Sequence, residues 1–210
     1  MTPKKTLTAF LDELASSSPA PGGGSVAALA GALGAALTAM VCSLTIGKKK
    51  YAAVEQEMTR ILAQAGELRA RFTTLIDTDT AAFNKVMEAF GLPKDTDPQK
   101  ALRAAAVREA TKEATLVPLQ VMKHCIDALA LTRQVAVAGN LNSISDAGVA
   151  AWMLHAAVES AGLNVRINLN GLSDQEFVGW KSEELESLRK SSRMMLEEIQ
   201  SIVAEKLRKE

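Results

Sequence analysis

The stretch PAPGGGSVAALAGALGAALTAMVCSLTIGKKKY (residues 19–51) decides the fold expected for this chain. No charged residue lies between Glu13 and Lys48, a glycine triplet precedes the apolar part, and a lysine triplet follows it. A helix of this composition either spans a membrane or lies inside a helical domain. Small Ala and Gly side chains give weak transfer into lipid but allow close helix packing. We therefore expect a buried helix and no membrane partner.

The overall composition is that of one globular domain. The 210 residues are 48% hydrophobic and 23% charged, and 24 Lys and Arg balance 24 Asp and Glu. This balance creates no field that attracts nucleic acid, so no nucleic-acid partner is expected. The two cysteines, Cys42 and Cys125, belong to no metal-binding motif. They indicate buried free thiols, with a single disulfide as the alternative, no metal, and a cytoplasmic location.

Helical periodicity and helix breakers predict an all-α fold for residues 1–210, a single-domain antiparallel bundle of about six to seven helices. Long Ala-rich helices are expected, and Pro118 is expected to kink one of them. The segment NVRINLN (164–170) also alternates with period two, so a short extended piece is the alternative there. The predicted helices are Thr6–Ser16, Ser25 (as N-cap) to about Ile46, Tyr51–Phe90, Pro98 to about Thr132, a helix starting near Ser143 and continuing to about Leu172, and Ser173 to the end.

The helix expected over Tyr51–Phe90 has an apolar seam with one polar member, Asp79. The seam residues, spaced alternately four and three apart as in a helical bundle, are Val54, Met58, Ile61, Ala65, Leu68, Phe72, Leu75, Asp79, Ala82, Val86 and Ala89. A second line, expected to widen the buried face, consists of Leu62, Ile76, Phe83 and Phe90.

A carboxylate in an apolar seam must be paired, protonated or directed into a cavity. Asp79 is therefore the candidate general acid/base, and a salt bridge to a neighbouring helix is the alternative. Asp77 lies about 200° around the same helix, so it is expected on the solvated face.

Both ends of the uncharged helix could bind an anion. Free N–H groups and the helix dipole favour a carboxylate or phosphate at the helix start, although the glycines could also form a plain turn. The residues at this start are Gly22, Gly23, Gly24 and Ser25. At the other end, the cations Lys48 and Lys49 suit the helix dipole and could also contact an anionic substrate.

Two groups of polar side chains follow later in the chain. The segment AGNLNSISDAG (138–148) could line a pocket through Asn140 and Asn142. Within it, Ser143 and Asp146 fit an S-x-x-D capping pattern. Farther on, Asn164 and Asn168 would share one helix face, where their amides could contact a heterocycle or cross-link helices.

Three blocks of this sequence together resemble the cyclodeaminase/cyclohydrolase family. This family is the all-helical domain at the C-terminal end of formiminotransferase-cyclodeaminase, and it also occurs alone in bacteria. The resemblance covers essentially the whole chain. The blocks are FLDELASSSPAPGGGSVAALAGALGAALTAMVCSLTIGKKKY (10–51), DTDTAAFNKVMEAFGLPKDT (77–96), and GNLNSISDAGVAAWMLHAA (139–157) with NVRINLNGL (164–172).

The resemblance implies a homodimer that acts on tetrahydrofolate carrying a one-carbon unit. A cyclodeaminase closes N5-formimino-tetrahydrofolate to 5,10-methenyl-tetrahydrofolate and releases ammonia. A methenyltetrahydrofolate cyclohydrolase adds water to the methenyl compound and gives 10-formyl-tetrahydrofolate. Both reactions involve the cationic methenyl bridge, so one pocket could serve either. The alternative from another class is a non-catalytic helical dimer that binds folate or a partner protein.

The resemblance also suggests a role for each candidate residue. A carboxylate beside the cationic carbon stabilises its charge and can move a proton, so Asp79 takes this role, with Asp77 or Asp146 as substitutes. The glutamate carboxylates of folate are assigned to residues 22–25 and to Lys48 and Lys49. The residues assigned to contacts with the pterin or with the loop are Asn140, Asn142, Asn164 and Asn168.

Overall fold

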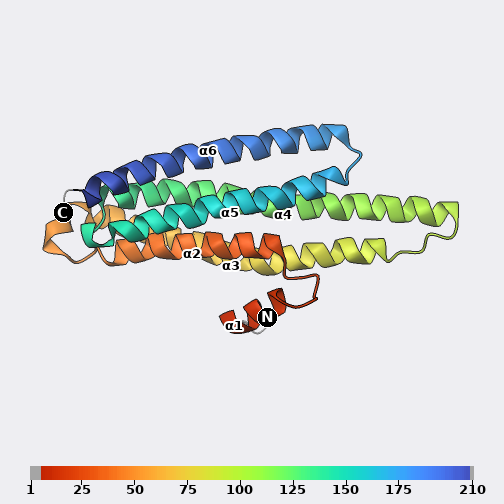
Figure 1. Cartoon of the computed structure of the whole chain (residues 1–210), viewed down its shortest axis with the longest axis horizontal. Coiled ribbons are helices and arrows are strands. Elements are labelled where there is room, and N and C mark those ends of the chain that lie inside the picture. Colours follow the sequence, from red (N-terminus) through yellow and green to blue (C-terminus); the bar gives the residue numbers. More distant parts are fainter. Residues whose placement is uncertain (1–5, 209–210) are drawn as a thin grey trace.

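The computed structural model describes residues 6–208, and these form long helices packed side by side (Figure 1). The elements are α1 (Leu7–Leu14), α2 (Gly23–Ser43), η1 (Lys49–Val54), α3 (Glu55–Phe90), α4 (Asp97–Ala138), η2 (Leu141–Ser143), α5 (Ile144–Asn170) and α6 (Gln175–Leu207). The described residues include no strand, so the predicted all-α bundle and its number of helices are confirmed. The predicted domain also takes in residues 1–5 and 209–210, which lie outside the described residues.

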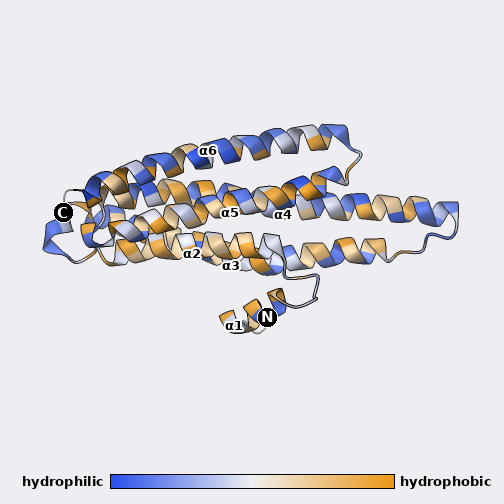
Figure 2. Cartoon of the chain, viewed as in Figure 1, coloured by the Kyte–Doolittle hydropathy of each residue, from blue (hydrophilic) through white to orange (hydrophobic). Residues whose placement is uncertain are grey.

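Helix α2 packs against α3, α4 and α5 on its inner side. Its glycines allow this contact, because an added Cβ at Gly31 would lie 2.6 Å from Cε1 of Phe72. At Gly34 it would lie 2.5 Å from Cγ of Leu154. The helix is long and apolar enough to cross a membrane, and 56% of its most apolar window is buried inside the protein. Its pale and orange colours contrast with the largely blue α6 (Figure 2).

The prediction that Ser25 caps α2 is wrong. The helix begins at Gly23, with Gly22 at the N-cap position and no side-chain cap. Ser25 lies inside the first turn and is completely buried, because its hydroxyl bonds to a side chain of α3. At its other end α2 stops at Ser43, and the chain turns through Gly47, whose φ is 77°.

Helix α4 continues six residues beyond the predicted end at Thr132 and passes through Pro118 without interruption. Proline has no N–H, so the carbonyl four residues earlier loses its helical donor. Here that carbonyl belongs to Ala114, and Nδ2 of Asn168 on α5 donates to it at 3.1 Å. Asn168 therefore cross-links two helices at the position of the proline. The predicted kink itself stays a prediction.

The predicted seam of α3 is buried without interruption from Met58 to Leu75, and beyond Leu75 Ala89 is its only buried member. Its buried members are Met58, Ile61, Ala65, Leu68, Phe72, Leu75 and Ala89. Beyond Asp79, α3 has passed the start of α2, and the α3–α4 hairpin extends past the ends of the other helices (Figure 1). The prediction that Phe90 is buried is wrong for this reason, since its side chain is 47% exposed.

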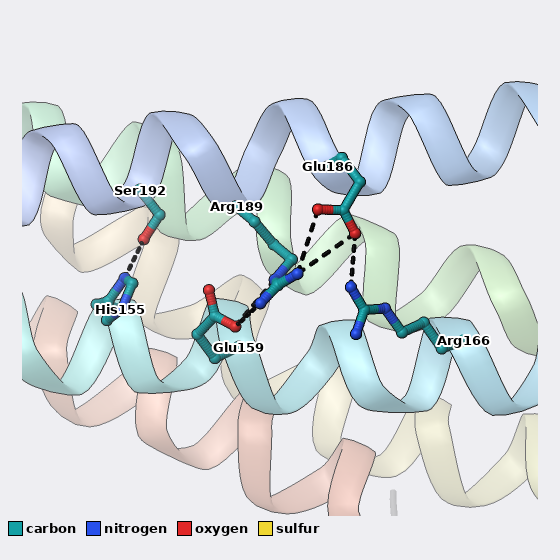
Figure 3. A network of polar contacts seen from close by, with 6 residues as sticks. All are labelled: His155, Glu159, Arg166, Glu186, Arg189 and Ser192. Carbon is teal, nitrogen blue, oxygen red and sulfur yellow. Dashed lines mark hydrogen bonds and ion pairs between the residues drawn. The ribbon is translucent and has the colours of Figure 1, made fainter.

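Polar contacts hold α6 against α5 (Figure 3). Arg189 of α6 forms an ion pair with Glu159 of α5 at 2.7 Å. Arg166 of α5 forms one with Glu186 of α6 at 2.6 Å. Nδ1 of His155 lies 2.9 Å from the hydroxyl of Ser192. The NVRINLN segment belongs to α5 and is helical throughout, which excludes the extended alternative.

Helix α1 is amphipathic as predicted, yet none of its residues is buried and it lies beside the bundle (Figure 1).

We expect Asn168→Ala to lower the free energy of unfolding by about 1–3 kcal/mol, because the Ala114 carbonyl loses its donor. In a Pro118→Ala background the restored N–H can bond to that carbonyl, so the same substitution should cost less. Urea denaturation of the four proteins gives the coupling. If Asn168→Ala lowers the free energy of unfolding equally in both backgrounds, the Asn168 amide does not replace the donor that Pro118 lacks.

Candidate functional site

Polar side chains from three helices meet at the start of α2. We call them the glycine-end cluster: Gly23, Gly24, Ser25, Asp79, Thr80 and Asn164. The Ser25 hydroxyl donates to Oδ2 of Asp79 at 2.9 Å. Asn164, from α5, lies against Gly23, where an added Cβ would be 3.2 Å from its Nδ2 atom. The helix start, the predicted acid/base and one predicted substrate amide therefore lie together.

The glycine at position 24 is required by the position of Asp79. A Cβ at this residue would overlap the Asp79 carboxyl group, with Oδ1 as the nearest atom. The carboxylate thus lies directly against the first turn of α2. The carboxylate accepts a hydrogen bond from a backbone N–H of that turn, as the side chain of an N-cap residue normally does at the start of a helix.

Asp79 is half-buried. Burial raises the pKa of its carboxyl group above the ordinary value, and hydrogen bonds from the hydroxyl and backbone N–H of Ser25 oppose this shift. The alternative of a salt bridge is not found, because no Lys, Arg or His within residues 6–208 contributes to this pKa. A carboxyl group with a raised pKa and no cationic partner is suited to exchange a proton with a ligand.

The start of α2 therefore already has an anionic partner. The sequence assigned this position to a substrate carboxylate, but the Asp79 carboxylate of the chain itself lies there. Ser25 is completely buried by this contact. Contact of residues 22–25 with substrate stays a prediction, and the structure gives them a direct role in holding Asp79.

A second polar group, the lysine-end cluster (Lys48, Lys49, Lys50, Tyr51, Asn140 and Asn142), lies at the other end of α2. Nδ2 of Asn140 donates to the Leu44 carbonyl at 3.0 Å, and the Tyr51 hydroxyl accepts from the backbone N–H of Leu141 at 3.0 Å. Asn140 is buried, whereas Lys48 and Lys49 are exposed. The 21 residues of α2 separate the two clusters by about 31 Å.

Asp146 also lies at the lysine end. It belongs to the first turn of α5 and precedes Asn164 by about 27 Å along that helix. The predicted capping box is wrong, because Ser143 makes no side-chain cap and instead donates to the Asn140 carbonyl. Within one chain, Asp146 is therefore far from Asp79, and Asp77 is exposed as predicted.

Between the two clusters, α2 and α5 expose a stripe of apolar side chains. Its members include Val26, Leu33, Met40, Leu44, Val149, Trp152, Leu163 and Ile167. Leu33 and Met40 of α2 and Val149 and Met153 of α5 line a groove within it. None of the predicted site residues belongs to this surface, although the absence of charge on every side of α2 is a sequence signal for it.

Neither metal nor disulfide chemistry is evident around these clusters. Within residues 6–208, no three His, Cys, Asp or Glu side chains are grouped to hold a metal ion. The absence of a metal from the reaction stays a prediction. Cys42 and Cys125 are buried free thiols, which excludes a disulfide between them, and burial raises the pKa of Cys42 to about 11.

We expect Gly24→Ala to fold but to displace the Asp79 carboxyl group, since the added methyl occupies its place. Gly66→Ala is the matched control, because a Cβ there meets nothing within 4 Å. The control should gain about 0.5–1 kcal/mol of stability from its helical position. Carbon-13 NMR of the Asp79 carboxyl group checks the displacement, and an unchanged chemical shift and titration in Gly24→Ala would contradict it.

Comparison with known proteins shows the family of this chain. The chain is 48% identical over 207 residues to a methenyltetrahydrofolate cyclohydrolase of Methylorubrum extorquens, covering 99% of this chain and 100% of that protein. It is 38% identical to the formimidoyltransferase-cyclodeaminase of Sus scrofa, covering 88% of this chain and 34% of that longer protein.

A solved structure has the same fold. The formiminotetrahydrofolate cyclodeaminase of Thermotoga maritima matches with a TM-score of 0.86 and 33% identity, and the match covers 96% of each chain. The family model described as formiminotransferase-cyclodeaminase matches residues 6–187. This chain therefore belongs to the formiminotransferase-cyclodeaminase family.

Proposed function

We propose that this protein is a folate-dependent one-carbon enzyme that hydrolyses 5,10-methenyl-tetrahydrofolate to 10-formyl-tetrahydrofolate. The cyclohydrolase relative is 48% identical along its full length, against 33% for the cyclodeaminase of known structure, and this difference supports hydrolysis over the second candidate given below. The observation that carries the proposal is the Asp79 carboxyl group, which is half-buried and has no cationic partner beside the start of α2. A group of this kind is suited to a reaction at a cationic carbon.

In the proposed hydrolysis, a water molecule attacks the carbon of the cationic methenyl bridge. Ionised Asp79 takes one proton from that water as the new C–O bond forms. The bond from this carbon to N5 then breaks, and N5 takes the proton from Asp79, while the second water proton leaves to solvent. N10 retains the formyl group. The carboxylate is thereby restored. Its charge stabilises the cationic bridge before the water attacks.

The second candidate is the cyclodeaminase reaction, which the Thermotoga structure supports through its match over almost the whole chain. Here N10 attacks the formimino carbon, and the leaving nitrogen must be protonated before ammonia departs. The proton of N10 passes to that nitrogen, and protonated Asp79 supplies the other proton, so ammonia leaves as the C–N bond breaks and Asp79 is left ionised beside the methenyl cation. Because burial raises the pKa of Asp79, the same residue can serve as base in one reaction and acid in the other.

We also propose that the protein is a homodimer formed through the exposed stripe on α2 and α5. A contiguous exposed apolar surface often marks a site of protein association. A second copy is the occupant that its composition favours, because a two-fold contact needs a self-complementary surface and α2 carries no charge. We expect this dimer to act in the cytoplasm without a nucleic-acid or membrane partner.

An antiparallel pairing of the two α2 helices would combine the two halves of the predicted site. A two-fold axis across the middle of α2 places the lysine end of one protomer beside the glycine end of its partner. A parallel pairing would instead bring six exposed lysines together. In the antiparallel dimer, the partner's Lys48 and Lys49 could bind the glutamate carboxylates of a folate whose reacting carbon lies at Asp79.

We expect Asp79→Asn to lower the rate of methenyl-tetrahydrofolate hydrolysis at least about 100-fold, because it removes the acid/base. Asp77→Asn is the control and should keep near-wild-type activity, since Asp77 is exposed on the other side of α3. Absorbance of the methenyl compound follows its loss, or its formation from the formimino compound. If the wild-type protein changes neither rate, the non-catalytic alternative is correct.

The shared site predicts complementation between two inactive proteins. A mixture of Asp79→Asn with the double variant Lys48→Ala/Lys49→Ala should regain about a quarter of the wild-type activity, because half of the dimers then contain one intact site. Subunits are exchanged under mild denaturant before the assay. Sedimentation without detergent checks that dimers form. A mixture no more active than its components would show that each site lies within one protomer, and a requirement for detergent would favour a membrane location for α2.

A further inference from the structure

We infer that Ser25 and Thr80 are positioning residues. The Ser25 hydroxyl hydrogen-bonds the Asp79 carboxyl group in both of its protonation states, and the Thr80 hydroxyl in turn contacts that of Ser25. This inference rests on the proposed role of Asp79 as acid/base. A residue that alternately takes and gives a proton needs a neighbour that can accept from it in one state and donate to it in the other. A buried hydroxyl with a second acceptor within reach can do both.

The surroundings of Ser25 provide these two acceptors. Its hydroxyl lies 2.9 Å from Oδ2 of Asp79 and 3.2 Å from the backbone carbonyl of Ile76. The group has one proton, so it donates to one of them at a time. With Asp79 ionised, the shorter, charge-assisted bond to the carboxylate is favoured. With Asp79 protonated, the carboxyl group donates to the Ser25 oxygen, and the serine proton turns to the Ile76 carbonyl.

Thr80 extends this arrangement by one group. Its hydroxyl lies 3.4 Å from that of Ser25, and either can be the donor. With Asp79 ionised, Thr80 can donate to Ser25 while Ser25 donates to the carboxylate, and such a chain polarises each bond. Thr80 is half-buried, whereas Ser25 is completely buried, so the chain leads from the carboxylate toward the surface.

The geometry also limits rotation of the carboxyl group. Gly24 lies against Oδ1 on one side, and Ser25 bonds to Oδ2 on the other. The elements packed around it add no charge: α2 has no charged residue, Asn164 of α5 is neutral, and Asp77 of α3 makes no contribution to the pKa. Ser25 is thus the group through which the fold can act on the proton affinity of Asp79.

The pH–rate profile of methenyl-tetrahydrofolate hydrolysis tests this inference. Ser25→Ala removes a bond to the ionised form, so the pKa of Asp79 and the acidic limb of the profile should move to higher pH. We expect kcat at neutral pH to fall about 10-fold or more. Thr80→Val should give a smaller shift in the same direction, and Thr80→Ser, which keeps the hydroxyl, should restore the wild-type limb.

Carbon-13 NMR titration of the Asp79 carboxyl group gives the same answer without an activity assay, and melting curves report on folding. An unmoved limb and titration in Ser25→Ala and Thr80→Val, even with lowered thermal stability, would overturn the positioning role. Full activity of Asp79→Asn would instead remove the proposed function, so the two failures are distinguishable. If Ser25→Ala does not fold, the Thr80→Val and Thr80→Ser pair still decides the outcome.

Discussion

The rest of the site depends on one contact, the approach of the Asp79 carboxyl group to the first turn of α2. The approach requires a residue without a Cβ at Gly24 and a small hydroxyl side chain at Ser25. Burial disfavours the charge of the carboxylate, while the helix start and the Ser25 hydroxyl favour it. Because burial and the hydrogen bonds act on the pKa of Asp79 in opposite directions, its carboxyl group can exchange a proton with a ligand. A fully solvated or ion-paired carboxylate does this less readily.

Close packing of α2 has a second consequence, which concerns the surface. A helix whose neighbours approach at Gly31 and Gly34 needs small apolar residues on its inner side. Its outer side is apolar as well, and that side has no partner within the described residues. The same helix thus positions the carboxylate at one end and offers an assembly surface along its length.

Much of the fold could be predicted because periodicity reports burial directly. The seam from Met58 to Leu75 and the polar exception at Asp79 are visible in the spacing alone. The ends of helices are harder to predict. Ser25 has a hydroxyl side chain that could cap a helix, but it lies inside the first turn of α2 and hydrogen-bonds Asp79 instead. Phe90 continues the pattern of its helix, yet at this end of α3 its ring is covered only in part, by Arg103 of α4, and stays 47% exposed.

The candidate site could be predicted as a set of residues but not as an arrangement. Sequence spacing cannot reveal that Asn164 lies beside Gly23 while Asp146, on the same helix, lies at the far end of the bundle. The assignment of residues 22–25 to a substrate anion considered only the free N–H groups of the helix start. The Asp79 carboxylate, which occupies the same helix start, comes from a helix more than fifty residues later in the chain. Its position there is set by the fold.

The proline in α4 gives α5 a polar attachment point in an otherwise apolar contact. Because Pro118 leaves the Ala114 carbonyl without its helical donor, Asn168 bonds to α4 at that point. Asn164 lies one turn earlier on α5, so the helix orientation that suits this bond also places Asn164 against Gly23. A residue that usually interrupts helices here supplies an acceptor that agrees with the position of a site amide in a different helix.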